Sequence, residues 1–174
     1  MQNDISKYLT QYKDIYDSEI YIEEFLKIDN FFLSSGNPNS NIVFIDQQYS
    51  SYTKLDIDKS DELFDKILSS VNLNRKNVYI LKAKSLSIKK LNLFEKSIAF
   101  HLGINKFRLI VCLGNDVMKI FFENFTSSQN KICKYKNFDI INIHHPLELL
   151  KNSKLKIRVW EDLKLIKSKY LNAS

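Results

Sequence analysis

The sequence of 174 residues contains only two cysteines, Cys112 and Cys133, too few for a disulfide framework or a metal site built from cysteine. Glycine occurs three times, and the chain has neither a Gly-x-Gly-x-x-Gly sequence nor a P-loop, so nothing indicates a nucleotide cofactor. A Gly-x-Ser-x-Gly nucleophile elbow is also absent. Because cysteine is scarce, we expect a reducing, cytoplasmic location.

No apolar run approaches the roughly 20 residues of a membrane span, and the first residues lack the basic and apolar regions of a signal peptide. We therefore expect no membrane partner. Hydrophobic residues make up 44% of the chain and aromatic residues 13%, which is enough for an ordinary core and excludes a largely disordered protein. The length predicts one main domain.

Arginine is also scarce, because only three of the 26 basic residues are arginine. Lysine-rich composition is typical of AT-rich genomes, so the distribution of charge says more than the net charge of +6. Residues 1–30 hold three basic and seven acidic residues, whereas residues 72–96 hold seven and one, and residues 151–174 hold seven and two. Basic segments of this kind either bind nucleic acid or form solvated helix faces, and both interpretations stay open.

The segment Ser-Ser-Gly-Asn-Pro-Asn-Ser at residues 34–40 concentrates turn-forming residues and predicts a linker. It divides the chain into an acidic, partly helical N-terminal leader (1–33) and a main domain (34–174). In that domain, short apolar runs alternate with helical periodicity. They predict strands at residues 42–45, 78–81, 109–113 and 138–143, and helices around residues 60–71, 91–102, 117–121 and 155–170.

Continuous apolar strands that alternate with helices predict an α/β fold, a three-layer α/β/α sandwich with a central four-stranded parallel sheet. Ligands bind beyond the carboxyl ends of the strands in open parallel sheets, so we expect the polar residues there to meet along one edge. The residues at these strand ends are Asp46, Gln47, Gln48, Tyr49, Lys82, Ala83, Lys84, Gly114, Asn115, Asp116, His144, His145 and Pro146.

The sequence His144-His145-Pro146 places two of the three histidines side by side at a strand end. An imidazole there is able to donate a hydrogen bond to a developing anion or to act as a general acid, although polar turns contain such histidines as well. Adjacent histidines on an extended chain point apart, and no third ligand is near. The sequence therefore predicts no metal site.

Asp46 and Gln47 are candidates for orienting a water molecule or a ligand amide, although a lone Asp at a strand end is often an Asx-turn or a helix cap. Gly114 and Asn115 either present backbone N–H groups to a phosphate or form a tight strand–helix turn. The segment 151–158 is placed to meet DNA phosphates or to form an ordinary helix face. Its basic residues are Lys151, Lys154, Lys156 and Arg158.

The order of these features over about residues 40–170 resembles the uracil-DNA glycosylase superfamily. Residues 145–150, His-Pro-Leu-Glu-Leu-Leu, are similar to the family's His-Pro-Ser-x-Leu-Leu loop, and residues 156–164 resemble its closing helix. Residues 109–114 look like an apolar family strand that ends in Leu-Gly, and residues 63–80 look like the helix and strand before the DNA-proximal loop.

Members of this family flip a damaged base out of DNA and hydrolyse its N-glycosidic bond. The resemblance implies that His145 stabilises charge on the departing base and that Asp46 or Gln47 places the attacking water. It further implies that the base pocket is formed by Gln48, Tyr49, Lys82 and Asn115. The DNA contacts would be made by Gly114, Lys151, Lys154, Lys156 and Arg158.

The motif residues nevertheless differ from the family pattern. The first motif of the iron–sulfur branch reads Gly-Glu-Ala-Pro-Gly, whereas residues 46–50 read Asp-Gln-Gln-Tyr-Ser, with Gln47 in the place of the acidic residue. Lys82 stands where the family has the Asn that reads the base, and Leu147 stands where it has Ser. The four cysteines that bind the cluster are absent, so we expect no iron–sulfur cluster and no other cofactor.

We therefore expect a uracil-DNA glycosylase-like protein of DNA replication or repair that has lost catalysis and acts by binding DNA or protein. A second hypothesis is an active, divergent glycosylase that uses His145 and Asp46. A third follows from a fainter resemblance to the psi subunit of bacterial DNA polymerase III, in which case residues 1–33 would bind a clamp-loader or repair protein. An α/β domain without a role at DNA is the remaining alternative.

Overall fold

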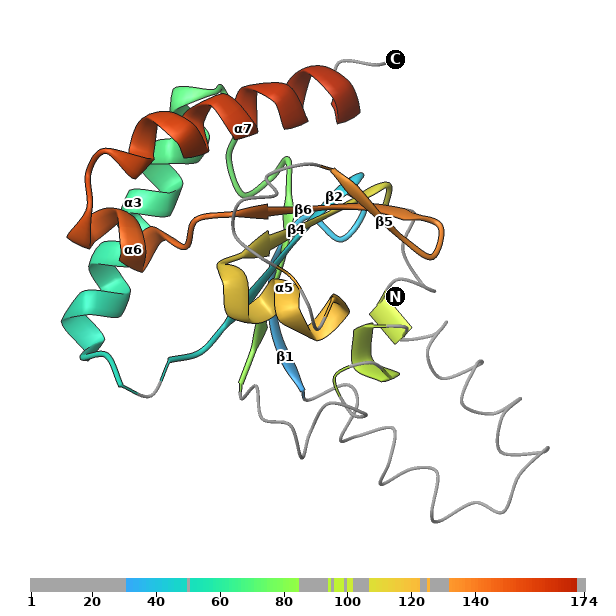
Figure 1. Cartoon of the computed structure of the whole chain (residues 1–174), viewed down its shortest axis with the longest axis horizontal. Helices are drawn as coiled ribbons and strands as arrows, with labels where there is room; N and C mark the ends of the chain where they lie inside the picture. The colour runs from blue at the N-terminus through green and yellow to red at the C-terminus, as the bar shows by residue number, and fades with distance from the viewer. Residues whose placement is uncertain are drawn as a thin grey trace, which may run out of the picture.

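The computed structural model describes residues 31–49, 51–84, 94, 96–98, 100–101, 107–122, 125 and 132–171. These residues contain a six-stranded sheet of order β1-β3-β2-β4-β6-β5 (Figure 1). The strands are β1 (Phe32–Gly36), β2 (Ile42–Gln47), β3 (Tyr79–Ala83), β4 (Leu109–Leu113), β5 (Cys133–Tyr135) and β6 (Phe138–Ile143).

The four central strands, β3, β2, β4 and β6, run parallel, as the sequence predicted. Two further strands were not predicted: β1 pairs antiparallel with β3 at one edge, and β5 pairs antiparallel with β6 at the other. β5 is only three residues long, and such a short run has little periodicity to detect.

Helices cover both faces of the sheet and produce the predicted three layers. The helices are α3 (Lys54–Ser70), α5 (Asn115–Phe121), α6 (Pro146–Lys151) and α7 (Leu155–Tyr170). One apolar core joins α3, α6 and α7 to one face of the sheet, and a second core joins α5 and the helical residues Phe94 and Ile98 to the other. In Figure 1, α3, α6 and α7 lie together on one side of the strands.

The predicted linker at residues 34–40 is wrong in its first half, because residues 34–36 belong to β1. Ser34, Ser35 and Gly36 pair with Leu81, Ile80 and Tyr79, respectively, so a neighbouring strand imposes extended structure on residues with turn composition. The predicted division between residues 33 and 34 falls inside this strand. The leader at residues 1–30 lies outside the described residues, as does half of the helix predicted at residues 91–102.

Helix α3 begins at Lys54, earlier than the start predicted near residue 60. Thr53 is the N-cap: its Oγ1 accepts from the Asp56 N–H at 3.2 Å, while the Asp56 carboxylate accepts from the Thr53 N–H at 3.2 Å. This reciprocal pair is a capping box, which satisfies two backbone donors at the start of the helix. Asp61, in the middle of α3, lies at the carboxyl edge of the sheet, where it contacts Lys82.

No helix in the described part of the chain is both long and apolar enough to cross a membrane.

Candidate functional site

Strand alternation places three polar side chains on one face of the sheet. Ile42 and Phe44 of β2 belong to the core under α3 and α7, and Val43 and Ile45 belong to the opposite core. Because side chains alternate along a strand, Asp46 continues the first set at the carboxyl end of β2. Lys82 follows Val78 and Ile80 on the same face of β3, and His145 follows Ile141 and Ile143 of β6.

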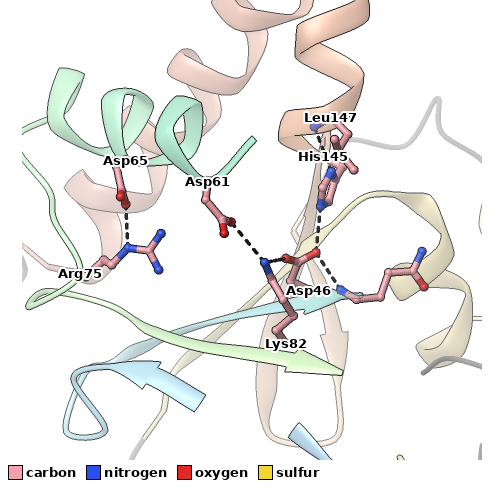
Figure 2. A network of polar contacts seen from close by, with 8 residues as sticks. Asp46, Asp61, Asp65, Arg75, Lys82, His145 and Leu147 are labelled. Atoms are coloured by element: carbon pink, nitrogen blue, oxygen red, sulfur yellow. Dashed lines mark hydrogen bonds and ion pairs between the residues drawn. The ribbon is translucent and has the colours of Figure 1, made fainter. Parts of the chain in front are cut away.

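Asp46 and His145 meet at this edge of the sheet (Figure 2). The His145 Nε2 lies 2.9 Å from the Asp46 Oδ1, and each residue is only 4% exposed. The other ring nitrogen, Nδ1, accepts a hydrogen bond from the Leu147 N–H at 3.0 Å, because His145 is the N-cap of α6. An accepting Nδ1 carries no proton, so Nε2 carries one and donates it to Asp46.

The Asp46 carboxylate has two further partners. Its Oδ1 also accepts from the Gln47 N–H at 2.7 Å, and its Oδ2 lies 3.3 Å from the Lys82 Nζ. Lys82 in turn donates to the Asp61 Oδ1 of α3 at 3.2 Å. We call Asp46, Asp61, Lys82 and His145 the Asp46 cluster. Burial alone lowers the pKa of Lys82, but attraction to Asp46 and Asp61 raises it overall, which keeps the ammonium charged.

Tyr49 covers the imidazole of the cluster. Its ring centroid lies 5.0 Å from that of His145, in an edge-to-face arrangement. Burial, the largest cause, raises the pKa of Tyr49 to about 12, so the phenol is neutral at physiological pH. The backbone at residue 114 passes close to His145, and this position requires a glycine: φ is 90°, and a Cβ atom there would lie 3.3 Å from the His145 Cβ.

Three other predicted site residues point elsewhere. The Gln47 side chain lies on the opposite face of the strand and reaches the Asp116 Oδ2 of α5 at 3.5 Å. Gln48 is exposed, and its N–H donates to the Ala83 carbonyl at 2.8 Å. Asn115 accepts a hydrogen bond from Asn142 at 2.8 Å. The structure therefore brings Asp46, Lys82, His145 and Tyr49 together. The Gln47 side chain touches this group through a hydrogen bond to Tyr49, and Gln48 and Asn115 lie outside it.

The predicted DNA-contacting cations are exposed at the end of α6 and the start of α7. They are Lys151, Lys154, Lys156 and Arg158. Lys151 donates to the Tyr52 hydroxyl at 2.9 Å, a hydrogen bond that raises the pKa of this lysine. Gly114 does not join them, because it is buried and its N–H donates to the Ile143 carbonyl at 2.8 Å.

A cavity of about 200 Å³ adjoins the Asp46 cluster. Its lining includes all four cluster residues, the polar residues Ser34, Ser35, Ser60 and Arg75, and the apolar residues Leu33, Phe64, Ile80 and Leu113. The contributions of β1 and α3 to this cavity were not predicted, because Ser34 and Ser35 have turn composition and Ser60 and Asp61 are typical helix caps.

His144, the other histidine of the pair, is directed to a different partner. Its Nδ1 lies 2.9 Å from the Glu148 Oε2, one helical turn further along.

Within the part of the chain that the structure describes, no three His, Cys, Asp or Glu side chains are grouped so as to hold a metal ion.

The fold and the cluster define a class: a three-layer α/β protein in which a carboxylate and an imidazole meet at the carboxyl edge of a parallel sheet, beside a cavity. A model of the Uracil DNA glycosylase superfamily matches residues 33–164, which is most of the chain. The protein therefore belongs to the uracil-DNA glycosylase superfamily. No curated protein matches the chain significantly.

Proposed function

We propose that this protein acts in DNA replication or repair as a catalytically silent member of its superfamily, which binds DNA without cleaving the N-glycosidic bond. The observation that carries the proposal is the state of the Asp46 carboxylate. Its two oxygens are occupied by the Gln47 N–H, the His145 Nε2 and the Lys82 ammonium, at 2.7, 2.9 and 3.3 Å.

Hydrolysis of an N-glycosidic bond through an oxocarbenium-like sugar needs negative charge near the sugar and a proton donor near the departing base. Lys82 places positive charge beside Asp46, which opposes the attraction between Asp46 and a cationic sugar. The Nε2 proton of His145 is already donated to Asp46. The two groups best suited to the reaction thus bind each other.

The same contacts give Asp46 a structural role. Asp46 is on β2, Lys82 on β3 and Asp61 on α3, while His145 connects β6 to α6. The cluster therefore ties three strands to two helices at the carboxyl edge. Removing one partner from a buried ion pair leaves an uncompensated charge, which is strongly destabilising.

DNA binding is supported by the exposed cations that follow the cluster in sequence. Since α6 begins directly after His145, Lys151, Lys154 and Lys156 lie close in sequence to the edge where the strands end. Lysine side chains that neutralise phosphates release counterions, so binding through them weakens as salt concentration rises.

A second candidate function, an active glycosylase, is favoured by two observations. The neutral Nε2–H form of His145 is suited to donate a hydrogen bond to a departing base. The adjoining cavity of about 200 Å³ has room for a small ring. For this function, a bound base would have to separate Asp46 from His145.

Uracil release under single-turnover conditions distinguishes the two functions. The substrates are single-stranded and duplex DNA with one uracil, and the proteins are wild type, His145→Ala and Lys82→Asn. We expect background release from all three proteins, together with salt-sensitive binding of the same DNA by wild type. Release by wild type at an enzyme-like rate that His145→Ala abolishes would establish the active glycosylase instead. Absence of DNA binding at low salt would overturn the proposed function.

A further inference from the structure

Helix α7 has an apolar surface on the side turned away from the sheet. Ile157 is 66% exposed, Trp160 39% and Leu165 50%. These are three of the six large hydrophobic residues that are exposed in the described part of the chain. Single exposed apolar residues are common, but three within about two turns of one helix form a patch. We call Ile157, Trp160, Lys164 and Leu165 the α7 outer face.

The α7 outer face is separate from the side of the helix that stabilises the fold. The residues that pack into the core are Val159, Leu163, Ile166 and Tyr170. At 100° per residue, Ile157 and Lys164 lie opposite these four, with Trp160 and Leu165 at the flanks. The core therefore does not explain the apolar residues of the outer face.

Positive charge borders the apolar side chains. The Lys164 Nζ lies 4.3 Å from the centroid of the Trp160 ring, a cation–π contact. Lys156 is exposed next to Ile157. The surroundings are not purely basic, because Glu161 is exposed and lies about one helical turn from both Ile157 and Leu165.

These features favour one class of partner over two others. A second copy of the same face would bring like charges together, which disfavours self-association. Nucleic acid would gain little from Ile157 and Leu165, because their aliphatic side chains have no ring on which a base can stack. Stacking on Trp160 is also limited, because Lys164 covers part of its ring. An acidic peptide with apolar side chains satisfies both the charge and the exposed apolar area.

We propose that the α7 outer face docks a short acidic segment of another protein. Apolar side chains of this segment contact Ile157, Trp160 and Leu165, and its carboxylates pair with Lys156 and Lys164. The site uses the side of α7 opposite the core and no residue of the Asp46 cluster, and it shares only Lys156 with the proposed DNA contacts. The acidic segment and DNA therefore compete at Lys156 alone.

A peptide display library tests which chemistry this face selects. Random 16-residue peptides are selected on the immobilised full chain, and binders that also bind Ile157→Asp are removed. Leu55→Asp is the matched control, since Leu55 is a 61% exposed residue of α3. We expect the remaining peptides to be acidic, to contain at least two large apolar residues, and to bind Leu55→Asp like wild type. Enrichment of neutral or basic peptides, or failure to enrich any that depend on Ile157, overturns the proposal.

Fluorescence then locates the contact, because Trp160 is the only tryptophan of the chain. A selected peptide should shift the emission to shorter wavelength in a saturable way, and Lys164→Glu should weaken its affinity about tenfold. A single-stranded 20-nucleotide DNA and vesicles of anionic lipid serve as alternative ligands. If either produces the same saturable shift at lower concentration than the peptide, the face binds that ligand and the proposal is wrong.

Discussion

Two aspartates lie at opposite ends of the parallel sheet, and each is held by a lysine and by a neutral hydrogen-bond donor. Asp46, at the carboxyl end of β2, contacts His145 and Lys82. Asp139, at the amino end of β6, accepts from the Tyr170 hydroxyl at 2.5 Å and pairs with the Lys134 Nζ at 2.6 Å. A carboxylate with positive neighbours is therefore not by itself a sign of function, because both ends of the sheet have one.

The two clusters differ in what adjoins them. The Asp46 cluster contains an imidazole with a defined tautomer and lines a cavity of about 200 Å³. Asp139 instead joins the last turn of α7 to β6 and does not line that cavity. The comparison indicates that, of the two clusters, the Asp46 cluster is the one beside the cavity, while its contacts resemble those of a structural ion-pair cluster.

The largest expected effect on stability comes from removing the Asp46 carboxylate. Asp46→Ala leaves the His145 Nε2 proton and the Lys82 ammonium without their buried partner, so we expect the free energy of unfolding to fall by about 3 kcal/mol. Urea denaturation measures the change. Asp61→Ala is the control: its side chain is 46% exposed, and loss of such a pair should change stability by less than about 1 kcal/mol. Equal losses in both variants would contradict a structural role for Asp46.

The second largest expected effect is on DNA binding, which should depend on lysines near the carboxyl end of the sheet and not on lysines near its amino end. Lys154→Ala with Lys156→Ala should weaken binding of single-stranded DNA about tenfold and reduce the slope of log K against log salt by about 0.7 for each phosphate that is no longer neutralised. Fluorescence anisotropy at several salt concentrations measures both quantities. Lys134→Ala with Lys136→Ala, near the amino end of β6, is the matched control and should bind like wild type. If both pairs weaken binding equally, the DNA surface does not belong to the carboxyl edge.

A smaller effect is expected where α7 ends. Tyr170→Phe removes the hydroxyl that donates to Asp139, so we expect a loss of about 1 kcal/mol in the free energy of unfolding. Thermal or urea unfolding measures it, and Tyr135→Phe on the nearby β5 is a suitable comparison. No difference between Tyr170→Phe and wild type would show that this hydrogen bond contributes nothing net.

The pH dependence of the Asp139 cluster gives the smallest change. Burial alone raises the pKa of Asp139, but hydrogen bonds from Lys134 and Tyr170 lower it overall. A lowered folded-state pKa means that the stabilisation is complete above the unfolded value of about 4 and disappears as pH falls through the folded value. The stability difference between wild type and Asp139→Asn should therefore be constant from about pH 5 to 7 and shrink below about pH 4. A difference that grows on acidification would contradict these contacts of Asp139.

The sequence was most informative where local pattern and tertiary structure agree. The apolar runs at residues 42–45 and 109–113 are buried strands, and the parallel order follows from their alternation with helices. The proximity of Asp46 and His145 was accessible for the same reason, since the carboxyl ends of parallel strands meet at one edge. The closing helix at residues 155–170 has the predicted bounds.

Features that depend on a distant partner could not be read from the sequence. Strand β1 exists because Ser34 and Ser35 pair with β3, although their composition favours a turn. The direction of Asn115 is set by its hydrogen bond to Asn142, a residue on another strand. The early start of α3 does have a local signal in the sequence, the Thr53–Asp56 capping box, which the prediction of a later start did not use.

The structural role of Asp46 is tested most directly by measuring uracil release and the free energy of unfolding on wild type and Asp46→Asn side by side. If Asp46 holds the edge of the sheet together and does no chemistry, the substitution lowers stability while release stays at the same background level in both proteins. The contradictory result is enzyme-like release by wild type that Asp46→Asn abolishes while the variant remains folded.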